Sequence, residues 1–124
     1  MEKIFYKEES YQIIGLCMEV HRVLGKGFSE SVYKDALEIE FRNNDVPYKR
    51  EKRFDILYKG ILLPHFYNAD FVCYDRIILE AKAIEMLHSG SLKQTLNYLA
   101  ASRLKLGLLV NFGEDSLQYK RVVL

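Results

Sequence analysis

The sequence predicts an α/β fold, a single small domain in which a mixed β-sheet is flanked by α-helices. Two N-terminal segments and one segment near residue 90 repeat apolar residues at the helical spacing of three and four. Between and after them lie short runs rich in aromatic and β-branched residues, which favour strands. The chain has 124 residues, of which 49% are hydrophobic, so residues 1–124 are expected to form one compact domain.

The composition gives no sign of a strongly basic nucleic-acid-binding protein, a zinc protein or a membrane protein. Eighteen basic and seventeen acidic residues leave a net charge of +1, which does not by itself indicate a nucleic-acid-binding protein. The two cysteines, Cys17 and Cys73, lack the spacing of a zinc site and are expected to be buried free thiols. Neither a membrane-length apolar run nor a signal peptide is present, so we expect a cytoplasmic protein that does not contact membranes.

The first helix is expected to begin with Ser10 as its N-cap and to end at Gly25. One apolar stripe follows the helical period and consists of Ile13, Cys17, Val20 and Leu24. His21 lies beside this stripe without a second histidine nearby, so we interpret it as a packed, hydrogen-bonded residue and not as a metal ligand.

A second helix is expected after Ser29, with Tyr33, Leu37 and Phe41 on its buried stripe, ending at Asn43-Asn44. Glu30 lies on the same stripe, and two interpretations stay open. An acid in the first turn is favourable to the helix dipole. Alternatively, Glu30 faces inward and approaches a metal ion directly or through water.

The middle of the chain is expected to form antiparallel strands. Residues 52–58 and 61–67 flank Lys59-Gly60, where glycine permits a tight turn, and Pro64 indicates a sheet edge or a bulge. A basic run precedes this turn and consists of Lys49, Arg50, Lys52 and Arg53. It suggests a nucleic-acid contact only weakly, because charged edge strands commonly face solvent.

The C-terminal third is expected to contain a helix from Ser89 or Ser91 to Arg103, with Leu92, Leu96 and Leu99 on one side. A buried strand at residues 105–112 and an alternating strand at 117–124 follow. The strand, helix and strand between residues 76 and 112 should therefore form a right-handed parallel crossover.

Residues 67–74 and 76–83 are expected to form a hairpin that carries the most informative polar residues. If the loop is Tyr74-Asp75-Arg76, Asp70 lies opposite Glu80, and Lys82 shares their face because side chains alternate along a strand. A two-residue loop would send Asp70 and Glu80 to opposite faces. The functional interpretation therefore depends on the register.

Two carboxylates directly opposed on a sheet repel each other unless a cation lies between them. Asp70, Glu80 and the backbone carbonyl of Ala81 are oxygen donors that suit Mg²⁺ or Mn²⁺. Lys82 could orient or deprotonate an attacking water and offset charge on a phosphate. The alternative is a solvated strand face on which Lys82 pairs with an acid.

The segment Gly27-Phe28-Ser29-Glu30-Ser31-Val32-Tyr33 has the form GxxExxY, and the chain resembles the GxxExxY family of the PD-(D/E)xK nuclease superfamily. The resemblance covers residues 10–124. It also includes Asp70, Glu80-x-Lys82, the pair Gln94 and Tyr98, and the strand end at residues 108–113.

This resemblance implies a restriction-endonuclease-like core with Asp70, Glu80 and Lys82 as catalytic residues and Glu30 as an additional acid on the preceding helix. Gln94, Tyr98 and Tyr33 would support the site or its substrate. The sequence departs from the family pattern at Asn68-Ala69-Asp70, which replaces Pro-Asp, and at Ser91, which replaces a histidine. Neither change removes an implied metal ligand.

Three functions follow as expectations. The first is a metal-dependent nuclease that hydrolyses phosphodiester bonds in DNA or RNA. The second is a nucleic-acid-binding or protein-binding module that retains the fold without catalysis, and the third is an inert structural domain. A homodimer is plausible for a nuclease because two copies can cut two strands.

Overall fold

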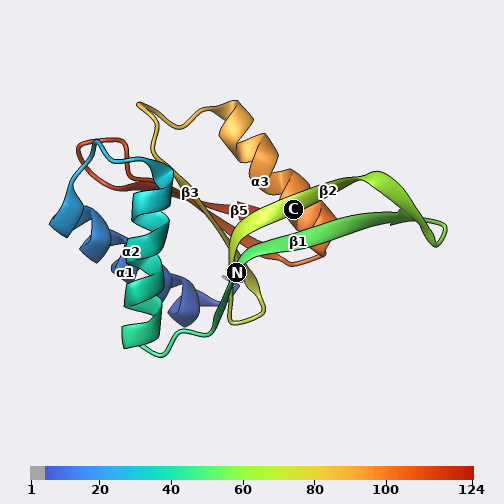
Figure 1. Cartoon of the computed structure of the whole chain (residues 1–124), viewed down its shortest axis with the longest axis horizontal. Helices are drawn as coiled ribbons and strands as arrows, with labels where there is room; N and C mark the ends of the chain where they lie inside the picture. Colours follow the sequence, from blue (N-terminus) through green and yellow to red (C-terminus); the bar gives the residue numbers. More distant parts are fainter. Residues whose placement is uncertain (1–4) are drawn as a thin grey trace, which may run out of the picture.

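The structure, a computed structural model, describes residues 5–124, so residues 1–4 of the expected domain lie outside the described part. The described residues form three helices and five strands, whose arrangement is shown in Figure 1. In order, these are α1 (Lys7–Leu24), α2 (Glu30–Asn43), β1 (Tyr48–Tyr58), β2 (Ile61–Cys73), β3 (Ile77–Lys82), α3 (Ser89–Ser102), β4 (Leu106–Asn111) and β5 (Gln118–Val123).

The strands form one mixed sheet in the order β1-β2-β3-β4-β5. All neighbouring strands are antiparallel except β3 and β4, which are parallel and are joined through α3. The predicted α/β class and the parallel crossover are therefore confirmed. No helix in the described residues is long and apolar enough to cross a membrane.

Helices cover both faces of the sheet (Figure 1). On one face, α1 and α2 pack through Ile13, Leu37 and Phe41 against a cluster that includes Phe71 and Leu79. On the other face, α3 packs against a second cluster, which includes Ala69, Val72, Ile78, Tyr98 and Leu109. The alternation along β3 divides its residues between the two cores, so Glu80 and Lys82 fall on the α3 side with Ile78.

The predicted start of α1 at Ser10 is wrong, because the helix begins at Lys7. Ser10 is fully buried, and its hydroxyl donates to the carbonyl of Lys7 while accepting a bond of 2.5 Å from Arg121. The contact with Arg121 of β5 explains the difference, because a distant residue satisfies the serine that was expected to cap the helix. The predicted end at Gly25 is confirmed, and its φ of 68° suits glycine.

The β1–β2 hairpin is longer than predicted, because β1 begins at Tyr48 instead of residue 52. Arg50 forms ion pairs of 2.7 Å with Asp35 and 3.1 Å with Glu38 of α2. These contacts hold the first residues of β1 against α2. The expected irregularity at Pro64 is confirmed, since the pairing of β1 with β2 shifts between Asp55 and Leu57, opposite this part of β2.

The buried side of α3 differs from the predicted leucine stripe. Its buried residues are Ser91, Thr95, Tyr98 and Leu99, whereas Leu92 and Leu96 are only partly buried. Small residues let α3 approach β4 closely, because a Cβ atom at Gly107 of β4 would lie 2.8 Å from Cγ2 of Thr95 on α3. The polar side chains of α3 therefore face the sheet and the candidate site.

Candidate active site

The structure has the three-residue loop on which the predicted site depends. Tyr74, Asp75 and Arg76 connect β2 to β3, and the register pairs Cys73 with Ile77 and Phe71 with Leu79. Tyr74 and Asp75 both have a positive φ, of 56° and 54°, which lets the chain reverse within three residues. In this register Asp70 and Glu80 are the next opposed positions.

Asp70 and Glu80 stand at a fork where β2 separates from β3. The strand pairing stops at Phe71 and Leu79, and each carboxylate instead accepts a backbone N–H of the opposite strand. The amide of Asp70 donates to Oε1 of Glu80 at 3.0 Å, and the amide of Ala81 donates to Oδ2 of Asp70 at 2.8 Å. These reciprocal bonds hold the two carboxyl groups side by side.

The environment of Glu80 disfavours its charged form. Its side chain is 2% exposed, and burial, followed by the nearby charge of Asp70, raises its pKa to about 9. Burial and the same two carboxylates raise the pKa of Tyr98 to about 12. A site that penalises negative charge in this way would gain free energy from a bound cation, so its oxygen donors fit a hard divalent metal ion.

Lys34 of α2 is a site residue that the sequence reasoning missed. Its Nζ lies 3.3 Å from Oδ1 of Asp70 and 2.8 Å from Oε1 of Glu51, and its side chain is 14% exposed. Burial alone would lower the pKa of Lys34, but the hydrogen bond with Glu51 and the charge of Asp70 outweigh it and raise the pKa. The signal was present, because Lys34 follows Glu30 by four residues and shares its helix face.

Lys82 lies at the end of β3 beside an open cleft of about 450 Å³. Its Nζ donates to Oε1 of Gln94 on α3 at 2.6 Å, so Gln94 lies directly beside Lys82. Glu30 lines the same cleft from the start of α2. The cleft is otherwise lined by Ile84, His88, Gly90, Ser91, Lys93 and Asn97.

The GxxExxY segment shapes the turn that brings Glu30 to this cleft. Gly27 has a φ of 114°, which glycine adopts without strain. Tyr33 is fully buried, stacks on Phe112 with 4.6 Å between ring centroids, and donates to the carbonyl of Gly25 at 2.6 Å. Tyr33 therefore anchors the turn from inside the core and does not line the cleft.

Not all predicted ligands come together. In the described range 5–124, no three His, Cys, Asp or Glu side chains are grouped closely enough to hold a metal ion, so Glu30 does not complete a three-acid cluster with Asp70 and Glu80. The ladder places Ala81 beside Val110 of β4, and its carbonyl stays a predicted ligand. Tyr98 packs edge-on against Tyr67, with ring centroids 5.5 Å apart.

Asn111 at the end of β4 is a second supporting residue that was not singled out. Its Oδ1 accepts the amide of Ile84 at 3.0 Å, and its Nδ2 donates to the carbonyl of Ile84 at 2.9 Å. A Cβ atom at Gly113 would lie 2.2 Å from the same carbonyl, so glycine is needed for this close approach. Asn111 and Gly113 thereby fix the segment after Lys82 that lines the cleft.

Two other predictions, which concern His21 and the two cysteines, are confirmed. His21 is buried, and its Nε2 donates to the carbonyl of Glu114 at 2.9 Å, as expected for a packed residue. Cys17 and Cys73 are buried free thiols. Burial raises the pKa of both, that of Cys73 to about 12, so neither is a reactive thiolate at neutral pH.

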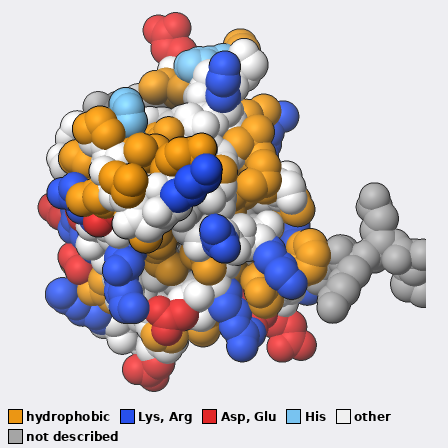
Figure 2. Space-filling view, turned by 90° about the vertical axis from the view of Figure 1, so that its right-hand side faces the viewer, with side chains coloured by type: hydrophobic (Ala, Val, Ile, Leu, Met, Phe, Trp, Pro, Cys, Tyr) orange, Lys and Arg blue, Asp and Glu red, His pale blue; other side chains and the backbone are white. Residues whose placement is uncertain are grey.

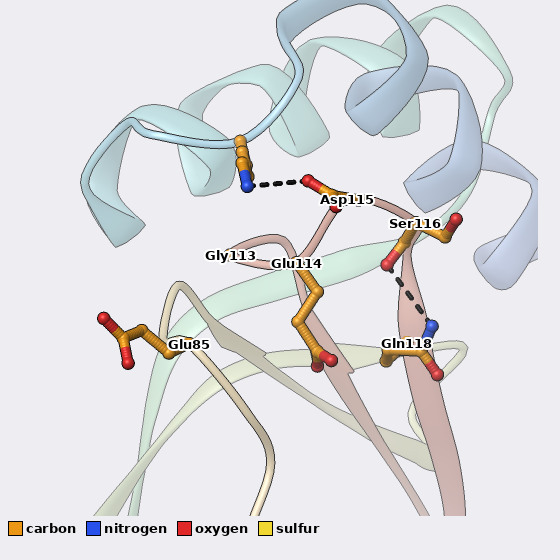
Figure 3. Close-up of a pocket in the computed structure, with 7 residues that line it drawn as sticks. Glu85, Gly113, Glu114, Asp115, Ser116 and Gln118 are labelled. Atoms are coloured by element: carbon orange, nitrogen blue, oxygen red, sulfur yellow. Dashed lines mark hydrogen bonds and ion pairs between the residues drawn. The ribbon is translucent and has the colours of Figure 1, made fainter.

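A separate hollow lies at the loop between β4 and β5 (Figure 3). Its acidic side chains are Glu85, Glu114 and Asp115, of which Asp115 pairs with Lys26 at 2.6 Å and Glu114 accepts from Asn111 at 2.8 Å. None of the predicted site residues lines this hollow. Asp70 and Glu80 do not line the cleft beside Lys82 either, so the predicted site residues lie in two neighbouring places, the fork and the cleft.

Comparisons with known proteins bear on the family and the fold. The sequence model of the PD-(D/E)XK nuclease superfamily matches residues 7–122. The structure resembles the crystal structure of an alkaline exonuclease, LHK-Exo, from Laribacter hongkongensis, with a TM-score of 0.55 and 11% sequence identity, covering 99% of this chain and 72% of the exonuclease chain. No curated protein sequence matches the chain. Because the superfamily match spans almost the entire chain, the protein belongs to the PD-(D/E)XK nuclease superfamily.

Proposed function

We propose that the protein is a metal-dependent nuclease that hydrolyses phosphodiester bonds of DNA or RNA. The observation that carries the proposal is the fork, where Asp70 and buried Glu80 lie side by side, with Lys82 two positions beyond Glu80 at the edge of the cleft. Membership of a nuclease superfamily supports it.

Asp70 and Glu80, with the backbone carbonyl of Ala81, would hold Mg²⁺ or Mn²⁺. When bound, the ion would polarise the phosphate and stabilise the charge that develops during hydrolysis. Two carboxylates suffice for such a site, because Mg²⁺ commonly retains several waters and binds substrate phosphates. Glu30 would contribute through a water molecule, because it does not join the two other acids directly.

Lys82 would orient the attacking water and take part in its deprotonation, while its ammonium form offsets phosphate charge. Gln94 is a positioning residue, because its Oε1 holds Nζ of Lys82 at the edge of the cleft. Tyr98 and Tyr33 support the site from the core, through Tyr67 and the GxxExxY turn respectively.

The first test is thermal melting with and without Mg²⁺ or Mn²⁺. A ligand that binds only the folded state raises the melting midpoint, by about 2.7 kcal/mol of stabilisation at a hundred times its Kd. We expect a concentration-dependent rise for the wild type and none for Asp70→Asn. An equal rise in both proteins would place the metal elsewhere and count against the site.

A second test uses Lys34, whose ammonium occupies the position beside Asp70 where a cation would bind. Lys34→Met should strengthen Mg²⁺ binding about tenfold, since two unit charges about 4 Å apart repel by roughly 1–4 kcal/mol at a protein surface. Glu51→Gln should have the opposite effect, because Asp70 is then the one remaining ion-pair partner of Lys34 among the described residues.

The measurement is the dependence of the melting midpoint on Mg²⁺ concentration, and Lys7→Met on α1 serves as the control for loss of one positive charge. If Lys34→Met instead weakened metal binding, the role of Lys34 would be to orient Asp70.

One observation favours the alternative of a binding module without catalysis. In the described residues, the carboxylate of Asp70 already has an ion pair with Lys34 and a hydrogen bond from the amide of Ala81, and the carboxylate of Glu80 accepts the amide of Asp70. The fold can therefore retain these acids without a metal. A homodimer stays a prediction, and sedimentation of the purified protein would test it.

A further inference from the structure

The hairpin of β1 and β2 extends beyond the rest of the sheet (Figure 1). β3 pairs with β2 only from Phe71 to Cys73, so residues 52–68, here called the arm, have no third strand beside them. At the base of the arm, Phe54 and Tyr67 pack against the α3 cluster. The distal part projects away from both cores.

The distal arm exposes large apolar side chains. They are 49% to 66% exposed and consist of Leu57, Tyr58, Ile61, Leu62 and Phe66. Clustered apolar exposure of this kind marks interaction surfaces more often than isolated apolar residues do. The register of β1 with β2 places Leu57, Leu62 and Phe66 on one face of the hairpin and Tyr58 and Ile61 on the other, so a partner that contacts all of them wraps around the arm.

Basic side chains lie beside two exposed aromatic rings of the arm, those of Tyr58 and Phe66. The guanidinium of Arg53 lies 3.9 Å from the centroid of Phe66, and Nζ of Lys59 lies 5.6 Å from that of Tyr58. Lys52 adds a third cation, whereas the one acid of the arm, Asp55, is paired with Arg53 at 2.9 Å. Figure 2, which views the molecule from the arm side, shows hydrophobic and Lys or Arg side chains next to each other over the middle of this face.

The arm is also continuous with the candidate active site. β2 runs from Phe66 to Asp70 in four residues, a distance of roughly 13 Å at the usual rise of a strand. At the base of the arm, Glu51 contacts Lys34, which in turn contacts Asp70. A chain bound along the arm would therefore be directed toward the fork.

We propose that the arm binds single-stranded nucleic acid that wraps around the hairpin, with bases on Tyr58 and Phe66 on its two faces and phosphates beside Lys52 and Lys59. Aromatic rings next to cations provide the two contacts that unpaired strands use, stacking of bases and neutralisation of the backbone. Bases inside a duplex are already stacked and cannot reach such rings. This inference rests on the proposed nuclease function and deepens it, since it names the class of substrate.

The test is fluorescence anisotropy of a labelled oligonucleotide, single-stranded or annealed, in EDTA so that binding is measured without cleavage. Tyr58→Ser combined with Phe66→Ser should weaken binding of the single strand by about tenfold or more. Lys52→Gln combined with Lys59→Gln should reduce the slope of log affinity against log salt by about 1.4.

The matched control is Tyr11→Ser on α1, where an exposed ring also has a lysine, Lys7, 5.8 Å from its centroid. It should bind the oligonucleotide like the wild type. Melting curves of all variants identify any that fail to fold, and the lysine variant retains every apolar side chain of the arm.

Unchanged affinity in both arm variants, or tighter binding of duplex than of single strand by the wild type, overturns the proposal. A wild type that sediments as a dimer and is dissociated by Leu57→Asp also overturns it, because the arm is then a contact between copies. Arm-dependent binding without cleavage of any substrate in Mn²⁺ would instead refute the catalytic function alone. Cleavage that survives intact in arm variants with unchanged affinity refutes only the arm.

Discussion

Lys82→Ala is expected to abolish cleavage while leaving the fold intact. The side chain lies at the cleft edge and donates an exposed hydrogen bond to Gln94, so its removal disturbs no buried hydrogen bond of the described residues. A positioned group that transfers a proton contributes about 10²–10⁴-fold to a rate. Loss of the positive charge near the phosphate would add to that effect.

The assay measures cleavage of single- and double-stranded DNA and RNA in Mn²⁺ by the wild type, Lys82→Ala and Gln94→Ala. Gln94→Ala should lower kcat less, because it frees Lys82 without removing it. Lys105→Ala, an exposed lysine at the start of β4, is the control for loss of charge. A Lys82 variant that cuts at the wild-type rate would show that any nuclease activity arises from another site.

The local sequence reduced the central part of this site to two alternatives, a three-residue or a two-residue loop at Tyr74. The structure has the three-residue loop, in which Asp70 and Glu80 are opposed. The alternation along β3 then placed Lys82 on their face. Strand period is a local property, which explains why it could be read without a structure, whereas the choice between the two loop lengths required the observed register.

Other features depend on contacts between distant segments. At the fork, the carboxylates of Asp70 and Glu80 accept backbone N–H groups that would bond to backbone carbonyls in a regular ladder. No sequence pattern predicts this replacement. The ion pair of Lys34 with Asp70 joins a helix to a strand 36 positions away. The early start of β1 depends on Arg50 meeting the acids of α2. These contacts require the packing of α2 on the sheet to be known.

Glu80→Gln is expected to stabilise the metal-free protein, increasingly so as the pH rises. In the unfolded chain the carboxyl has its ordinary pKa of 4.5, whereas burial and then Asp70 raise its pKa to about 9 in the fold. Between these values the folded state keeps a proton that the unfolded state has released. The free energy of unfolding of the wild type therefore falls with pH across this window, by up to about 1.4 kcal/mol per pH unit.

Glutamine does not ionise, and its Oε1 can still accept the amide of Asp70, so the variant should not show this fall. Urea unfolding in EDTA from about pH 5 to pH 9 should give a difference between variant and wild type that widens with pH, reaching at least about 2 kcal/mol near pH 8.

Glu85→Gln, in an exposed loop, is the matched control and should follow the wild type. In Mg²⁺ the stability advantage of Glu80→Gln over the wild type should become smaller or change sign, because only the wild type is stabilised by the metal. Curves for Glu80→Gln and wild type that coincide at every pH would mean that Glu80 is solvated and ionised, and the fork would then lack the electrostatic strain from which a metal ion could gain binding energy.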